Sequence, residues 1–114
     1  MRTEQEIDFD RAREIAIGFL TSHIPEFLTK SYSSFLEESY VEHEDCWIFY
    51  RNKNIIIPRH SGRIGADWAY AIGKLGGVML VPDHSGNEIE LTKQLEYLSK
   101  YFRTHDAKGS PLPR

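Results

Sequence analysis

The stretch SYVEHEDCWIFYRNK, residues 39–53, decides the fold of this chain. Its side chains follow a period of two on both sides of the polar pair Glu44 and Asp45. This pattern is typical of two short strands joined by a turn, because successive side chains of a strand point to opposite faces of a sheet. We therefore predict an antiparallel strand pair over these residues.

A second strand pair is predicted further along the chain. Residues 78–81 read VMLV, residues 82–86 read PDHSG, and residues 88–91 read EIEL. Proline, aspartate and glycine favour a tight turn, and the alternation after the turn is typical of a returning strand. This predicted hairpin over residues 78–91 is the clearest local signal in the sequence.

Two irregular connections are predicted between these parts. Residues 58–77 contain five of the eight glycines, and glycine weakens both helices and strands. We expect a long loop there, with one helical turn around residues 67–72. Residues 26–36 mix apolar residues with serines, and we predict an irregular connection.

Helical spacing marks both ends of the chain. Apolar residues recur at steps of three and four from Phe9 to Ile24, which predicts a helix from Asp8, as its N-cap, to His23. A second helix is predicted to begin with Thr92 as its cap, and its apolar residues are Leu95, Leu98 and Phe102.

The sum of these elements predicts the α+β class. We expect an antiparallel sheet of about four strands, with the N-terminal and the C-terminal helix packed on one face. Residues 1–104 are predicted to form a single domain. Residues 105–114 carry a glycine, two prolines and little apolar content, so we predict a flexible, frayed C-terminal tail.

Composition narrows the class of protein. The 114 residues suit one domain, and a hydrophobic content of 40% is too high for intrinsic disorder. The net charge of −3 gives no electrostatic basis for nucleic-acid binding. Neither a secretory signal nor a run of about twenty apolar residues occurs, so we expect a cytoplasmic protein that does not bind or span a membrane.

Catalysis, metal binding and cofactor binding receive little support. The five histidines lack the spacing of metal ligands, and Cys46 is the only cysteine. The glycines of residues 62–77 match no phosphate-binding motif. Asp83 and His84 beside His60 form the one plausible cluster for a metal ion. An enzyme would need Cys46, Asp83 and His84 to converge. We predict no catalytic residue, no metal ion and no cofactor.

A docking surface is the remaining candidate for a functional site. The densest acidic stretch holds five carboxylates in nine residues, and such a run is either a solvated face or a patch that attracts a basic partner. Tyr50, Trp68 and Tyr70 are expected to supply exposed aromatic contacts beside it. The predicted partner-binding residues are Glu37, Glu38, Glu42, Glu44, Asp45, Arg63, Asp67, Trp68 and Tyr70.

The whole pattern resembles a known family. The strand segments at residues 40–42 and 46–50, the stretch GVMLVPDHSGNEI at residues 77–89 and the segment LEYL at residues 95–98 are similar to the immunity protein 35 or YrhB-like family. The resemblance covers residues 8–103. It implies a small bacterial α+β domain that is cytosolic and is the immunity partner of a polymorphic toxin, with some relatives described as chaperone-like. It brings no catalytic residues.

Two hypotheses of function follow. The first is a non-enzymatic immunity protein that neutralises a cognate protein toxin in a tight one-to-one complex, and that is a monomer or homodimer when free. The second is a chaperone-like or peptide-binding module that uses a sheet edge to add a strand. They differ in stoichiometry, because an immunity protein has one partner whereas a chaperone has many weak ones.

Overall fold

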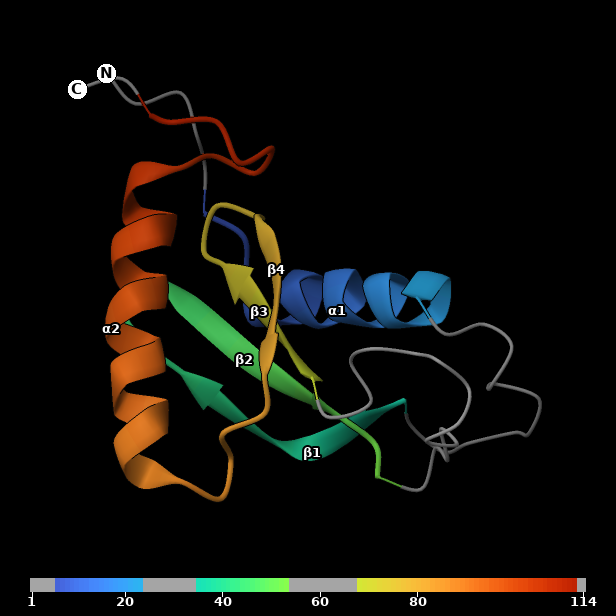
Figure 1. The fold of residues 1–114 in the computed structure, drawn as a ribbon. Coiled ribbons are helices and arrows are strands. Elements are labelled where there is room, and N and C mark those ends of the chain that lie inside the picture. The colour runs from blue at the N-terminus through green and yellow to red at the C-terminus, as the bar shows by residue number, and fades with distance from the viewer. Residues whose placement is uncertain (1–5, 24–34, 54–67, 113–114) are drawn as a thin grey trace.

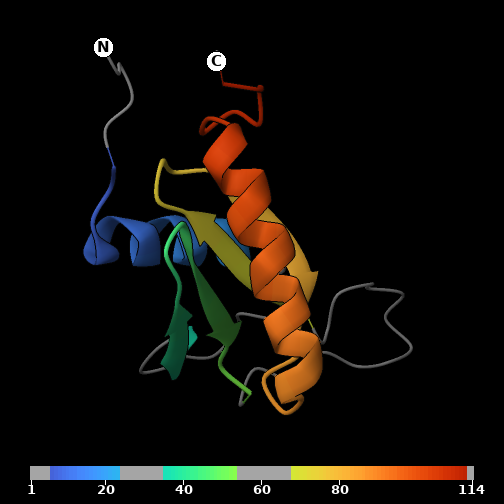
Figure 2. The same cartoon turned by 90° about the vertical axis from the view of Figure 1, so that its left-hand side faces the viewer.

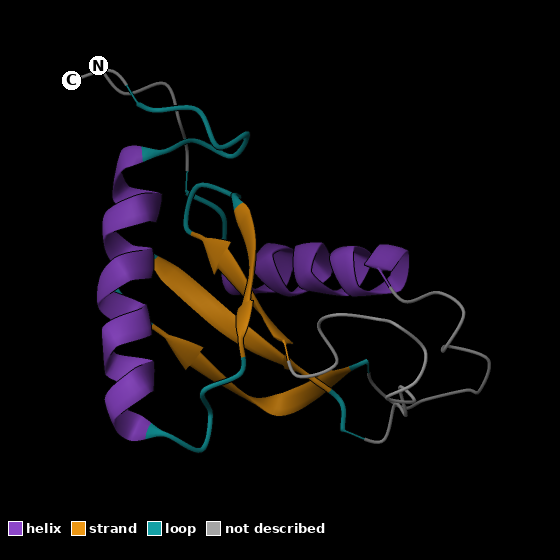
Figure 3. Ribbon diagram, in the orientation of Figure 1, coloured by secondary structure: helices purple, strands orange, loops and turns teal. Residues whose placement is uncertain are grey.

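A four-stranded antiparallel sheet with a helix at each end of the chain forms the fold (Figures 1 and 3). The computed structural model describes residues 6–23, 35–53 and 68–112. The sheet order is β1-β2-β3-β4, so β1 and β4 end the sheet and β2 and β3 form its centre. The predicted α+β class and the four antiparallel strands are confirmed. The elements are α1 (Phe9–His23), β1 (Leu36–Glu42), β2 (Cys46–Arg51), β3 (Trp68–Gly73), β4 (Val78–Pro82) and α2 (Glu88–Thr104).

The two helices lie on opposite faces of the sheet, whereas the sequence predicted both on one face. Side chains alternate along β2, so Trp47 and Phe49 pack with Ala16 of α1. Ile48 packs with Leu98 of α2 on the other face. The two helices run crosswise on either side of the strands (Figures 1 and 2). The prediction was wrong because the run CWIFY has no polar face, and a strand buried on both faces needs a cover on each.

β3 was predicted as part of a long loop with a helical turn, and this prediction was wrong. The strand pairs with both β2 and β4, and five of its six residues are buried. The large residues Tyr70 and Ile72 face α1, and the small residues Ala69 and Ala71 face α2. Sheet pairing outweighs the local preference of the glycines around the strand, because each backbone group buried at the centre needs a partner.

The predicted return strand over residues 88–91 is also wrong, because α2 begins there. β4 finds its partner in β3, so the chain after Pro82 is free to leave the sheet. Asn87 caps the helix: its side-chain Oδ1 accepts a hydrogen bond of 3.1 Å from the backbone N–H of Glu90. Thr92, the predicted cap, lies inside the helix, and its hydroxyl donates to the carbonyl of Glu88.

α1 has the predicted extent and cap. Asp8 Oδ1 accepts a hydrogen bond of 2.8 Å from the N–H of Arg11 in the first turn. The strand pair predicted over residues 39–53 is confirmed as β1 and β2, with β1 beginning earlier, at Leu36. The irregular connection was predicted over residues 26–36, but β1 already begins at Leu36, and residues 26–34 lie outside the described residues. Residues 58–67 of the loop predicted over 58–77 also lie outside them.

Residues 105–112 differ from the frayed tail that their composition predicts. His105 forms a bridge with Pro111, and the N–H of Leu112 donates to the carbonyl of Thr104. Asp106 Oδ1 accepts hydrogen bonds of 2.9 Å from the N–H groups of Lys108 and Ser110. The segment is thus held by backbone hydrogen bonds, although it has little apolar content. The same hydrogen bonds lower the pKa of Asp106 below its usual value.

Candidate functional site

The candidate site is the acidic edge of the sheet, defined as Glu37, Glu38, Tyr40, Glu42, Glu44 and Asp45 on β1 and the turn after it. Residues 38–40 and Glu42 are exposed, although they belong to a strand. The two helices make most of their sheet contacts with β2 and β3, which leaves the outer strand less covered. A strip with four glutamates and one aspartate therefore lies along this side of the sheet, in which Glu38, Glu42 and Glu44 are exposed and Glu37 and Asp45 are half-buried.

Tyr40 is the residue of the acidic edge that sequence reasoning missed. Its side chain is 45% exposed, although its ring centroid lies 4.7 Å from that of Phe9 and 6.0 Å from that of Phe49. Packing against two rings restricts the rotamers of Tyr40 before any partner arrives. Its position between Glu38 and Glu42 in the alternation of an outer strand is the signal that could have revealed it.

Glu42 is held by a lysine from the β3–β4 turn. Lys74 Nζ lies 2.7 Å from Glu42 Oε2 and 4.1 Å from the ring centroid of Trp47. The hydrogen bond from Lys74, together with its charge, lowers the pKa of Glu42 below its usual value. Glu42 is therefore ionised at neutral pH and paired with Lys74.

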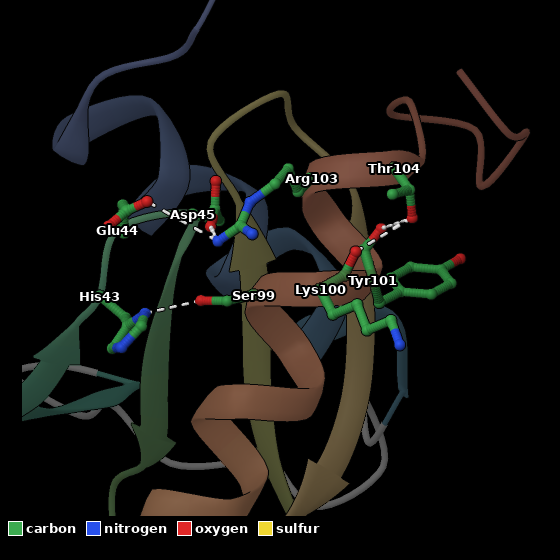
Figure 4. A network of polar contacts seen from close by, with 8 residues as sticks. All are labelled: His43, Glu44, Asp45, Ser99, Lys100, Tyr101, Arg103 and Thr104. Carbon is green, nitrogen blue, oxygen red and sulfur yellow. Dashed lines mark hydrogen bonds and ion pairs between the residues drawn. The ribbon is translucent and has the colours of Figure 1, made fainter. Parts of the chain in front are cut away.

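The turn between β1 and β2 is tied to α2 by three contacts (Figure 4). Arg103 Nη2 lies 2.9 Å from Asp45 Oδ2 and 3.7 Å from Glu44 Oε1. A hydrogen bond of 2.6 Å joins Ser99 Oγ to His43 Nδ1. The bond to Asp45 raises the pKa of Arg103 above its usual value. The ordering of this turn thus depends on residues more than fifty positions away in the sequence.

The charge of the acidic edge is only partly neutralised by these contacts. Lys74 and Arg103 are the two cations paired with it in the described part of the chain. Glu44 remains 77% exposed despite its pairing, and Glu38 is exposed. At the other end, Glu37 Oε2 accepts a hydrogen bond of 3.1 Å from the N–H of Lys53. The edge therefore keeps a negative excess that faces solvent.

The other predicted contact residues fall elsewhere. Tyr50 and Tyr70 were expected to be exposed, but they are 4% and 1% exposed, and this expectation is wrong. They lie in the two central strands, which the helices cover on both faces. Trp68 is half-buried at the start of β3, two strands away from β1. Arg63 and Asp67 lie outside the described residues.

The residues considered for an enzyme do not converge. Cys46 begins β2 and pairs with Gly73, whereas Asp83 follows Pro82, which pairs with Trp68 at the other end of β3. Six strand residues span about 17 Å. Cys46 is also buried, and the loss of solvent, followed in size by the charge of Asp45, raises its pKa to about 12. A protonated, covered thiol is a poor nucleophile.

Metal-binding groups and deep cavities give no alternative site. Within residues 6–23, 35–53 and 68–112, no three His, Cys, Asp or Glu side chains are placed to hold a metal ion. His60 lies outside these ranges. An open hollow of about 730 Å³ lies beside the start of α2 and is lined by Asn87, Ile89 and Lys93 among others. The Asn87 side chain there already caps its helix.

Comparison with known proteins gives no relative from which a site could be inferred. The chain matches no family model, no curated protein and no solved structure. The helices of the described chain are too short or too polar to cross a membrane.

Proposed function

We propose that this protein is a non-enzymatic immunity protein, which neutralises a cognate protein toxin by forming a tight one-to-one complex with it. The observation that carries the proposal is the acidic edge: an exposed aromatic ring, Tyr40, packs against two other rings and lies among carboxylates. The resemblance to the immunity protein 35 or YrhB-like family favours this role over other kinds of protein binding.

Tyr40 has the properties of an energetic anchor for a protein interface. Tyrosine is enriched among the residues that dominate binding energies, and a ring that is already fixed loses little entropy when it is covered. A standard interface buries about 800 Å² on each partner. The exposed part of β1 and the turn after it form the centre of such an area.

The carboxylates define the chemistry of the partner. Negative charges around an anchor attract a positively charged surface, accelerate its association and orient it. The fitting partner is a toxin whose active site or substrate groove is lined by lysine and arginine. Occlusion of that groove by the acidic edge is the proposed means of neutralisation.

A second candidate function is a chaperone-like or peptide-binding module. The observation that favours it is the open order of the sheet, in which β1 and β4 each pair with one described strand. Stoichiometry separates the two functions, since a chaperone holds many clients weakly whereas an immunity protein holds one partner tightly.

The first test is capture of the tagged protein from its native cell lysate, followed by mass spectrometry of intact complexes at moderate and high salt. We expect a single one-to-one partner that survives high salt. A heterogeneous set of weakly held proteins would favour the chaperone function instead. Recovery of the free protein alone would count against both functions, provided that the cells are shown to express the genes next to the one that encodes this protein.

The second test uses matched variants of the captured complex. We expect Tyr40→Ala to weaken binding about 30-fold, as loss of an anchor costs about 2 kcal/mol, and Glu38→Lys to slow association. Tyr97→Ala and Glu96→Lys make the same chemical changes at exposed positions of α2 and serve as controls. Equal affinities and rates for all four variants would remove the acidic edge from the interface.

A further inference from the structure

We infer that the acidic edge recognises its partner by strand addition: a short, extended, basic segment of the partner pairs with β1 as a fifth strand. The inference rests on the proposed function and specifies how the same site makes contact. Three features of β1 carry it, namely the direction of its backbone groups, the limits of its regular pairing and the charge of its side chains.

The backbone N–H and C=O groups of Tyr40 and Glu42 point away from β2, toward the open side of β1. The N–H of His43 donates to the carbonyl of Cys46 at 2.8 Å, so these residues form a hydrogen-bonded pair. Such pairs alternate along an antiparallel ladder with pairs whose N–H and C=O groups point outward. Tyr40 and Glu42 are opposite Phe49 and Trp47 in this register, which places them in the outward-pointing pairs.

The regular part of this edge is short. The register with β2 shifts between Leu36 and Tyr40, and β1 ends at Glu42. A bulge twists a strand and interrupts the ladder that a neighbour can follow. Two residues with outward N–H and C=O groups offer four hydrogen bonds, so the added segment is about three to five residues long.

Side-chain charge selects a basic segment. A residue of the added strand that bonds to Tyr40 or Glu42 has its side chain on the same face as theirs. Lysine or arginine at alternate positions would then face Glu42 and Glu38 and contact the ring of Tyr40. The same charges oppose the pairing of β1 with a second copy of itself, because like carboxylates would meet across the ladder.

The other outer strand is less suited to this role. Pro82 at the end of β4 has no N–H, and its carbonyl accepts a hydrogen bond of 2.8 Å from Gln94 Nε2. β4 also contains no charged side chain that would select a partner. Strand addition is therefore assigned to β1.

The test uses a synthetic peptide, acetyl-Lys-Val-Lys-Val-Lys-amide, titrated into the ¹⁵N-labelled full chain. We expect the amide signals of Tyr40 and Glu42 to shift progressively and to yield a dissociation constant. The matched control has the same sequence and charge but carries a methyl group on the backbone nitrogens of its lysines, which removes the donors of the added strand. It should bind at least tenfold more weakly.

Each outcome separates the mode of contact from the proposed function. Equal binding of the two peptides, or shifts that map away from β1, would overturn strand addition. Absence of peptide binding would also overturn it, whereas the capture experiment with Tyr40→Ala tests the docking role independently of any peptide. A tenfold preference for the unmethylated peptide, lost in Glu42→Lys but kept in Glu96→Lys, would establish both the edge and its charge selection.

Discussion

Gly73 determines how closely α2 approaches the sheet. A Cβ atom at this position would lie 2.5 Å from Cδ1 of the Phe102 ring, which is shorter than any ordinary contact. Phe102 is 4% exposed and belongs to the core cluster between the sheet and α2. The absence of a side chain on the last residue of β3 therefore makes room for the largest residue that α2 inserts.

We expect Gly73→Ala to lower the free energy of unfolding by about 1–3 kcal/mol, the usual cost of overpacking a core. Urea unfolding followed by circular dichroism measures the change. Gly18→Ala is the matched control, because nothing lies within 4 Å of its added Cβ in α1. Alanine is the better helix former there, so stability should rise by about 0.5–1 kcal/mol. Similar effects of the two substitutions would contradict the packing described for Phe102.

The capping of α2 is the test of where this helix begins. We expect Asn87→Ala to destabilise the protein by about 1 kcal/mol, because it removes the side-chain acceptor for the N–H of Glu90. Thr92→Ala should change stability by less than half as much, since Thr92 lies within the helix. Thermal unfolding of both variants gives the comparison. A larger loss for Thr92→Ala would place the start of the helix where the sequence predicted it.

Local patterns predicted the elements that are regular by themselves. The stripe from Phe9 to His23 and the alternation through β1 and β2 are visible in the sequence, and the structure confirms both. The start of α2 was obscured because EIEL at residues 88–91 alternates as a strand does while it also fits the first turn of a helix.

Other features depend on contacts between distant residues. β3 is a strand because β2 and β4 flank it, and its own sequence, WAYAIG, lies among glycines that favour a loop. In the candidate site, the sequence predicted the carboxylates, but the ties to Lys74 and Arg103 and the exposure of Tyr40 arise from tertiary structure. The burial of Tyr70 has the same origin, because α1 covers the face of the sheet on which its side chain lies.

At the scale of the whole molecule, one sheet is shared by two cores. Trp47 and Phe49 belong to the core under α1, and Cys46, Ile48 and Tyr50 belong to the core under α2. Neither helix can detach without exposing one face of the same two central strands. We therefore regard the domain as a single cooperative unit.

Alkaline pH should weaken this unit. Loss of solvent is the main cause that raises the pKa of Cys46 from 9.0 and that of Tyr50 from 10.0, each to about 12. Between pH 9 and 12 the folded protein keeps protons that the unfolded chain releases, so the free energy of unfolding falls as pH rises. Urea unfolding at a series of pH values measures the slope.

Cys46→Ala provides the control for this pH dependence. The variant lacks one of the buried acids whose pKa is raised, so its stability should fall less steeply from pH 8 to 11, whatever its stability at pH 7. If the free energy of unfolding fell with pH at the same rate in the variant and in the original protein, the Cys46 thiol would lose its proton as easily in the folded as in the unfolded state. That result would contradict the burial of Cys46 beneath α2.

The alternation along β2 also limits how the gene for this protein can change. One codon inserted between those for Cys46 and Trp47 would shift the register of the strand by one residue and turn Trp47 and Phe49 toward the alanines beneath α2. Every later side chain of the strand would change sides with them. Substitutions can accumulate here one at a time, but insertions and deletions cannot, so the length of this segment should vary less than its composition.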